Sequence, residues 1–354
     1  MMTGPGHTRT GSPGNRAATP VLWGIVGTGH MASVLATEFA TLAADEAQLV
    51  AVCGRDAGRA AAFAARHDIR RIHGDFRHLA KDPDIDVLYI ATPHPLHHEC
   101  MLAAIEAGKA VLCEKPFTVN AVQAAEAIDA ARRRGVFVME AMWTRFLPAI
   151  AALRELLAGG AIGRIQMIVG GGAFMPDRNA GHYLFDPRRA GGVLLDAGVY
   201  LVSMASMLLG TPVRIQASGR IGASGVDEQD AVLLDHEGGA TACLYVSLHS
   251  KRPPELEILG DAGRICIPAP VFRPAHLVLW DREGRELRME HPIEGSGYGY
   301  QLRAVNAALR AGLTGCPIMP LEESLGIMRT LDGIRARIGL VYPGESRQPE
   351  GRNI

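Results

Sequence analysis

Short apolar runs alternate with helical stretches through the first 140 residues. The runs are apolar along most of their length, which is typical of strands buried on both faces of a parallel sheet. The predicted strands are residues 21–26, 48–53, 69–73, 86–91, 110–113 and 136–139. Capping residues and helical periodicity predict helices between them, at 33–42, 57–67, 75–81, 96–107 and 120–134. This alternation predicts an α/β domain with a doubly wound parallel sheet.

The pattern changes after a predicted helix at 148–157. A long strand (164–173), a loop (174–190) and an apolar helix (193–210) precede a series of strands between 213 and 289. Glycine-rich turns break this series, which indicates a mainly antiparallel sheet. Two closing helices, at 298–312 and 321–338, are expected to pack back on the first domain. We therefore predict a disordered tail at 1–20, domains at 21–142 and 143–342, and a second tail at 343–354.

Length and composition narrow the class of protein. A chain of 354 residues is long enough for about two domains, and 48% hydrophobic with 21% charged residues is typical of a soluble globular protein. The net charge of −1 gives no reason to expect a nucleic acid or an anionic membrane as partner. We expect no apolar run to be long enough to span a membrane, since that needs about 20 residues. Six scattered cysteines without a C-x-x-C pair favour a reducing, cytoplasmic location.

A glycine-rich turn joins the first predicted strand to the first predicted helix. Its sequence is Gly27-Thr28-Gly29-His30-Met31, followed by alanine, which fits the G-x-G-x-x-G/A pattern of dinucleotide sites. The first glycine permits the tight turn and the second lets the backbone approach a pyrophosphate. The free amide groups of the helix N-terminus then bind phosphate oxygens. These five residues are predicted to bind the cofactor.

The end of the second strand bears on which cofactor is used. An acidic residue there favours NAD, whereas an arginine accommodates the 2′-phosphate of NADP. The chain has Gly54, Arg55 and Asp56 at this position, so we expect Arg55 to bind NADP, with NAD remaining possible. In the alternative interpretation, Arg55 faces solvent and Asp56 caps the next helix.

The carboxyl ends of the later strands carry further candidate residues. Ligands bind at this edge of a doubly wound sheet. The expected cofactor-lining residues there are Thr92, Pro93, His94, His97, Glu114, Lys115, Trp143 and Arg145. The H-x-x-H-H cluster lacks an acidic or cysteine partner at suitable spacing, so we predict no metal site. Trp143 and Arg145 have an alternative role as a link between the two domains.

Candidate acid–base groups lie on the apolar helix of the second half. Asp196 and Tyr200 are four residues apart and therefore project from one face. A phenol has a pKa of about 10 and becomes useful near neutral pH only if a cation lowers that value. Lys115 is the candidate cation, which makes Lys115, Asp196 and Tyr200 the predicted catalytic group. Alternatively, Tyr200 is an ordinary core residue.

The loop before this helix is the candidate for substrate contacts. It offers aromatic and basic side chains but no decisive anion-binding cluster. The weak substrate candidates are Trp143, Phe174, Arg178, His182 and Tyr183.

Five segments together carry a family resemblance: GTGHMA, ATPHPLHHE, GKAVLCEKP, MEAMWTRF and GGVLLDAGVY. Over residues 21–342 the chain resembles the glucose–fructose oxidoreductase/inositol dehydrogenase (Gfo/Idh/MocA) family, and within it the dimeric dihydrodiol dehydrogenase branch, an NADP user. The resemblance implies a Rossmann domain joined to an α/β domain with a large open-faced sheet that often forms the dimer contact. It also implies that Lys115 lies near the nicotinamide and that Tyr200 is the general acid.

These observations lead to one functional hypothesis and two alternatives. We expect an NADP-dependent oxidoreductase, a homodimer or homotetramer, that acts on a secondary alcohol or carbonyl of a sugar, cyclitol or trans-dihydrodiol. The first alternative is a non-enzymatic NAD(P)-binding regulator, because fold does not fix function. The second is a glycosidase or lyase that retains its NAD(P).

Overall fold

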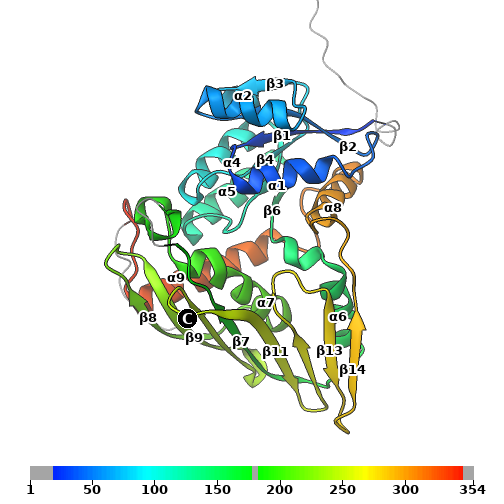
Figure 1. Ribbon diagram of the computed structural model, residues 1–354, viewed down its shortest axis with the longest axis vertical. Helices are drawn as coiled ribbons and strands as arrows, with labels where there is room; N and C mark the ends of the chain where they lie inside the picture. Colours follow the sequence, from blue (N-terminus) through cyan, green and yellow to red (C-terminus); the bar gives the residue numbers. More distant parts are fainter. Residues whose placement is uncertain (1–18, 178–181, 346–354) are drawn as a thin grey trace, which may run out of the picture.

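The computed structural model describes residues 19–177 and 182–345. Almost all of the predicted N-terminal tail, most of the C-terminal tail and the substrate candidate Arg178 lie outside these residues. The described chain contains two sheets, which lie one above the other along the long axis of the molecule (Figure 1).

The first sheet is parallel and has the strand order β3-β2-β1-β4-β5-β6, as predicted for a doubly wound fold. Its strands are β1 (Val21–Val26), β2 (Ala47–Cys53), β3 (Arg71–His73), β4 (Val87–Ile90), β5 (Ala110–Cys113) and β6 (Val138–Glu140). The helical segments that accompany it are α1 (His30–Phe39), α2 (Ala57–Arg66), α3 (Phe76–Ala80), η2 (His94–Leu96), α4 (His97–Glu106), α5 (Ala121–Arg134) and η3 (Trp143–Phe146). All of the predicted strands are present.

Several boundaries differ from the predictions for local reasons. The first helix begins at His30 rather than at residue 33, so the glycine turn leads directly into it. The segment predicted as one helix at 96–107 begins with the 3-10 turn η2, because Pro95 lies within its first turn. The sixth strand is displaced to Val138–Glu140. Asp75 and Asn120, where two of the predicted helices begin, each accept a backbone amide hydrogen bond as helix caps.

The second sheet has the order β14-β13-β12-β11-β7-β10-β9-β8 and is antiparallel except for the β7–β10 pair. Its strands are β7 (Ile165–Ala173), β8 (Arg214–Ile221), β9 (Asp227–Asp235), β10 (Thr241–Ser247), β11 (Arg252–Gly260), β12 (Arg264–Ile267), β13 (His276–Trp280) and β14 (Glu286–Glu290). The helical segments are α6 (Pro148–Ala158), η4 (Tyr183–Phe185), η5 (Pro187–Arg189), the π-helical turn η6 (Leu194–Gly198), α7 (Val199–Leu209), η7 (Glu237–Gly239), α8 (Gly299–Arg310) and α9 (Leu321–Ile338). The expected mainly antiparallel sheet is confirmed.

The two closing helices join the sheets, as expected. Asn306 of α8 accepts a hydrogen bond from the indole of Trp23 in β1 at 3.1 Å, and both residues are buried. Asp332 of α9 accepts one from the first amide of α5 at 2.8 Å. In Figure 1, α9 runs between the two sheets, where it packs on α5, α7 and β8. The closing helices therefore fix the first domain over the second.

The second sheet buries only one face. Side chains such as Ile168 and Val232 point into the core, whereas Met167 and Leu233 on the same strands are 39% and 40% exposed. This period-two alternation is typical of a sheet with one open face. One helical stretch, Pro187–Leu209, is long and apolar enough to cross a membrane, contrary to the expectation from the sequence. Because 61% of its most apolar window is buried inside the molecule, it has the character of a core helix.

Candidate functional site

The turn between β1 and α1 has the geometry of a pyrophosphate cradle. Gly27 has φ +116°, and a Cβ there would lie 2.4 Å from the carbonyl oxygen of Ala91, so only glycine fits. Gly29 has open space where its Cβ would stand, and no side chain caps α1 at this residue. His30 is exposed and Met31 partly exposed on the first turn of α1. The open backbone and the uncapped helix end fit a dinucleotide pyrophosphate.

The end of β2 shows what the two charged residues do. Gly54 packs against Thr28, whose methyl carbon would lie 2.9 Å from a Cβ at position 54. Asp56 caps α2 by accepting the amide hydrogen bond of Arg59 at 2.8 Å, which is the alternative role predicted for it. Arg55 is exposed at the strand tip. The end of β2 therefore presents the guanidinium of Arg55 to solvent, while the carboxylate of Asp56 is already hydrogen-bonded as a helix cap.

The two predicted histidines of the loop after β4 differ in position. His94 lies at the site: its Nδ1 is 3.2 Å from the carbonyl oxygen of Ala190, and it faces Lys115 and Asp196. Burial, together with the charges of His97 and Lys115, lowers the pKa of His94 to about 3, so its ring is neutral.

His97 does not line the site, contrary to expectation, because its ring is fully buried between two loops. Its ring nitrogens lie 2.9 Å from the carbonyl oxygen of Pro116 and 3.0 Å from that of Thr92. His97 thus ties the loop after β4 to the loop after β5. Among residues 19–177 and 182–345, no group of three or more metal-ligating side chains occurs.

Lys115 occupies the centre of the site at the carboxyl end of β5. Its Nζ donates to the carbonyl oxygen of Asp196 at 2.7 Å and is 3.5 Å from the carboxylate Oδ1. The same ammonium lies 4.9 Å from the centre of the Tyr200 ring. Burial alone would lower the pKa of Lys115, but the charge of Asp196 outweighs it and raises that pKa above its ordinary value. The pKa of Asp196 is lowered, since the nearby Lys115 charge outweighs its burial. Both groups are therefore charged at neutral pH.

Tyr200 is held by aromatic neighbours. The indole of Trp143 donates to its hydroxyl at 3.1 Å, and Trp143 stacks on Tyr298 with ring centres 4.2 Å apart. The ring of Phe272 lies 5.7 Å from that of Tyr200. Burial raises the pKa of Tyr200, while Lys115 and the indole hydrogen bond lower it. Lys115 thus lowers the pKa of Tyr200, as predicted, but the effect of burial is larger and the pKa is raised overall. Tyr200 is therefore a neutral phenol at neutral pH.

Glu114, a predicted cofactor contact, is only 5% exposed and is engaged inside the protein. Its carboxylate accepts a 2.5 Å hydrogen bond from the hydroxyl of Tyr89, which is fully buried on β4. Burial raises the pKa of Glu114. Its side chain supports the loop that presents Lys115 rather than reaching into the site.

Arg145 does not face the cofactor, contrary to the first expectation. Its side chain is 1% exposed and pairs with Glu323 of α9 at 2.6 Å. It also donates to the hydroxyl and the carbonyl oxygen of Ser203 at 3.0 and 2.6 Å. Arg145 therefore has a structural role, because its hydrogen-bonding groups are used in the core to link η3 to α7 and α9. These three elements all belong to the predicted second domain, so the contacts are not the link between the two domains that the alternative interpretation predicted.

The candidate substrate residues are only partly brought together. Tyr183 donates its hydroxyl to the carboxylate of Asp196 at 3.1 Å. His182 stacks on Tyr183, with ring centres 5.0 Å apart, and so lies one layer further out. Phe174 is 36% exposed just after β7, and within the described chain no ring contact joins it to Tyr200. Arg178 lies outside the described residues.

Three site residues were not predicted from the sequence. Tyr298 and Phe272 come from loops more than 70 residues beyond Tyr200 in the chain, and Tyr89 is on a buried strand. Nothing in their local pattern marks them, although Tyr298 belongs to a glycine-rich tyrosine segment, GSGYGY. Their role depends only on which elements the fold brings together.

The sheet, its glycine turn and the lysine–carboxylate–phenol group at its carboxyl edge define a nicotinamide-dependent oxidoreductase. A model of the oxidoreductase family with an NAD-binding Rossmann fold matches residues 21–142, and a model of the GFO/IDH/MocA C-terminal domain matches residues 150–266. The chain therefore belongs to the Gfo/Idh/MocA oxidoreductase family, as the sequence motifs indicated.

Similar proteins include trans-1,2-dihydrobenzene-1,2-diol dehydrogenases. The one from Mus musculus is 39% identical over 92% of this chain and 99% of its own length. The one from Homo sapiens is 37% identical with the same coverage.

The fold is also shared with solved structures. One is KijD10, a 3-ketoreductase from Actinomadura kijaniata solved with NADP, which has a TM-score of 0.81 and 26% identity over 90% of this chain and 98% of its own. Another is levoglucosan dehydrogenase in complex with NADH and levoglucosan, with a TM-score of 0.83 and 22% identity over 91% and 98%. The second comparison supports the fold only.

Proposed function

We propose that this protein transfers a hydride between NADP and a secondary alcohol or carbonyl carbon of a small hydroxylated ring. The observation that carries the proposal is the placement of Lys115 against both Asp196, at 2.7 Å, and the ring of Tyr200, at 4.9 Å. These groups lie at the carboxyl edge of the parallel sheet, where such folds bind ligands.

The bound nicotinamide supplies or accepts the hydride. In the direction of reduction, the neutral phenol of Tyr200 donates a proton to the substrate oxygen. The charge of Lys115 and the indole N–H of Trp143 then stabilise the phenolate that remains. In the direction of oxidation the same oxygen accepts the proton. Asp196 holds Lys115 in place through two of its oxygen atoms.

The lining of the site favours an uncharged ring as substrate. Lys115 and Asp196 neutralise each other, and Arg145 is buried elsewhere, so these groups offer no spare cation for a phosphate or carboxylate. The partly exposed rings of Tyr298 and Phe272 provide apolar surface, while the hydroxyl of Tyr183 and the carboxylate of Asp196 can bind hydroxyl groups. A sugar, a cyclitol or a trans-dihydrodiol fits this description, and the names of the curated relatives agree with the last of these.

The proposed preference for NADP depends on Arg55. It is exposed at the end of β2, where the 2′ position of the adenosine ribose is bound in this fold. Asp56, the nearby carboxylate, is occupied as the cap of α2 and does not compete for the ribose.

The replacement Tyr200→Phe tests the proposal. We expect it to lower kcat by about 10²–10⁴-fold without changing the affinity for NADPH, because it removes the proton donor and otherwise only the acceptor of the Trp143 indole hydrogen bond. Tyr245→Phe on β10 is the matched control and should leave kcat unchanged. Measurements use NADPH fluorescence for binding and turnover on sugars, cyclitols and dihydrodiols. Near-normal activity of Tyr200→Phe would remove this residue from the mechanism.

The same panel distinguishes the alternatives. Tight NADPH binding without turnover of any substrate would favour a regulator. Purification with nicotinamide already bound, and conversion of a glycoside without net redox change, would favour a glycosidase or lyase.

We further propose a homo-oligomer that associates through the open face of the second sheet, in the cytoplasm. Exposed apolar side chains such as Met167 and Leu233 support the first point, and six free cysteines support the second. Charged replacements at these two positions are expected to shift the mass measured by analytical ultracentrifugation to that of a monomer.

A further inference from the structure

The helix that carries Asp196 and Tyr200 receives its cap from a different element. It begins with the π-helical turn η6, and its own N-cap residue, Val193, makes no side-chain capping bond. Instead, the carboxylate Oδ2 of Asp227, at the start of β9, accepts the amide hydrogen bond of Leu194 at 2.7 Å. Leu194 is two residues before Asp196, so this bond fixes the chain next to the catalytic group.

The close approach of Asp227 depends on a glycine. Gly192 has φ +108°, and a Cβ at this position would lie 1.9 Å from Oδ1 of Asp227. Both the backbone conformation and the space therefore require glycine here. Asp227 itself is fully buried. A buried carboxylate is costly without hydrogen-bond donors, so its bond to Leu194 is important for both partners.

A second buried acid lies beside the first. Asp230, also on β9, is 1% exposed. The side chains of Asp227 and Asp230 interact directly with each other. Two carboxyl groups in contact share a proton, because both cannot be charged at once. Burial raises the pKa of both groups, and the charge of Asp227 raises that of Asp230 further. At neutral pH the pair therefore carries one proton, which forms a hydrogen bond between the two carboxyl groups.

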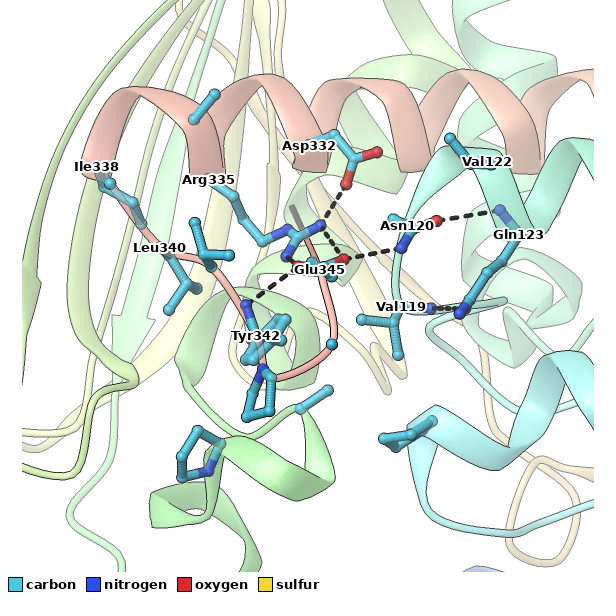
Figure 2. A pocket seen from close by; sticks show the side chains of 18 of the residues that line it. Val119, Asn120, Val122, Gln123, Asp332, Arg335, Ile338, Leu340, Tyr342 and Glu345 are labelled. Atoms are coloured by element: carbon cyan, nitrogen blue, oxygen red, sulfur yellow. Dashed lines mark hydrogen bonds and ion pairs between the residues drawn. The ribbon is translucent and has the colours of Figure 1, made fainter. Parts of the chain in front are cut away.

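The same turn is held from its other side by the C-terminal segment. The hydroxyl of Tyr342, which is 3% exposed, donates to the carbonyl oxygen of Gly191 at 2.6 Å. Figure 2 shows how this segment is fixed: Glu345 accepts hydrogen bonds from Arg335 at 2.7 Å and from Asn120 at 2.8 Å. The segment forms one wall of a cavity of about 940 Å³. Because the cavity side of the segment has no tightly packed neighbours, these hydrogen bonds hold the segment in place.

We propose that Asp227, as the hydrogen-bond acceptor of the Leu194 amide, is a positioning residue for Asp196. It fixes Leu194 and thereby holds the carbonyl and carboxylate oxygens of Asp196 against Lys115. Asp227 does not touch the reacting atoms and acts only through Asp196. This inference rests on the proposed function, in which Asp196 and Lys115 support Tyr200.

A double-mutant cycle between Asp227→Leu and Asp196→Asn tests the inference, because leucine has a similar size but no atom that accepts the Leu194 hydrogen bond. We expect Asp227→Leu to lower kcat by about 10–100-fold through misplacement of Asp196, with the Kd for NADPH unchanged. In the Asp196→Asn background the same replacement should change kcat by less than about 2-fold, because residues that act through one another are not additive.

Two matched variants accompany the cycle. Asp230→Asn should stay within about 3-fold of the unmodified protein, because its carboxamide still donates to Asp227. Asp235→Asn, at the far end of the same strand, should leave kcat unchanged. The folded fraction of every variant is measured by circular dichroism and used to correct kcat.

The outcomes separate the two proposals. If the unmodified protein turns over no member of the substrate panel, the proposed function fails. If Asp196→Asn alone leaves kcat unchanged, or if Asp227→Leu lowers kcat by the same factor in both backgrounds or has no effect, the inference fails and the proposed function of hydride transfer stands. If Asp227→Leu does not fold, Tyr342→Phe takes its place, since it removes the other contact to this turn. It is expected to lower kcat by about 2–10-fold, again only where Asp196 is present. An equal loss in both backgrounds would overturn the inference.

Discussion

Replacement of Arg145 by methionine decides between the two roles that the sequence left open for this residue. The buried guanidinium pairs with Glu323 at 2.6 Å and donates twice to Ser203. Removing one partner of a buried ion pair costs about 3–5 kcal/mol, because the other partner is left without its counter-charge. Glu323 remains 22% exposed, so water recovers part of the loss. We therefore expect the lower end of that range, about 3 kcal/mol, or a decrease in Tm of about 6–12 °C.

The chain offers a matched control, an arginine whose acidic partner lies on the same helix, α9. Arg132 pairs with Glu322, the neighbour of Glu323, but these side chains are 52% and 70% exposed. Arg132→Met should therefore cost less than about 1 kcal/mol. Thermal unfolding by circular dichroism measures both variants, and NADPH titration well below Tm measures cofactor binding. A Tm of Arg145→Met within about 2 °C of the unmodified protein, or a tenfold weaker NADPH affinity in the folded variant, would refute the structural role.

Two further predictions concern the cofactor and the buried acids. Arg55→Ala should raise the Kd for NADPH by about 10–150-fold, because it removes hydrogen bonds to the charged 2′-phosphate. The Kd for NADH, which lacks this phosphate, should not change. Arg59→Ala is the control, and equal effects on both nucleotides would contradict the assignment. The raised pKa of Asp230 means that the folded protein keeps a proton which the unfolded chain releases above about pH 4. The free energy of unfolding should therefore fall from about pH 4 to pH 9, relative to that of Asp230→Asn. Urea denaturation of both proteins between pH 5 and 8 measures this difference. If the two curves of unfolding free energy against pH run parallel, Asp230 is not protonated in the folded protein.

Much of the first domain could be predicted from the sequence because its signals are local. A buried parallel strand is apolar along its length, and the turn at Gly27 and Gly29 needs residues without a side chain, so both features are visible in a few consecutive letters. The candidates Lys115, Asp196 and Tyr200 come from local motifs as well. The structure brings these three together, although 81 residues separate Lys115 from Asp196.

The tertiary structure decided which of the polar residues face the site and what state they are in. His97 and Arg145 stand in the same motifs as residues that face the candidate site, yet their polar atoms are used in the core, and no local pattern records that difference. The pKa of Tyr200 is raised rather than lowered, since the cost of burying a charge depends on everything packed around it. Asp227 is 31 residues beyond Asp196 on a strand of the second sheet, and Tyr298 lies in the turn just before the closing helix α8. Sequence alone thus determined the local elements and the types of chemistry, whereas desolvation and long-range contact, which are properties of the packed chain, determined the site.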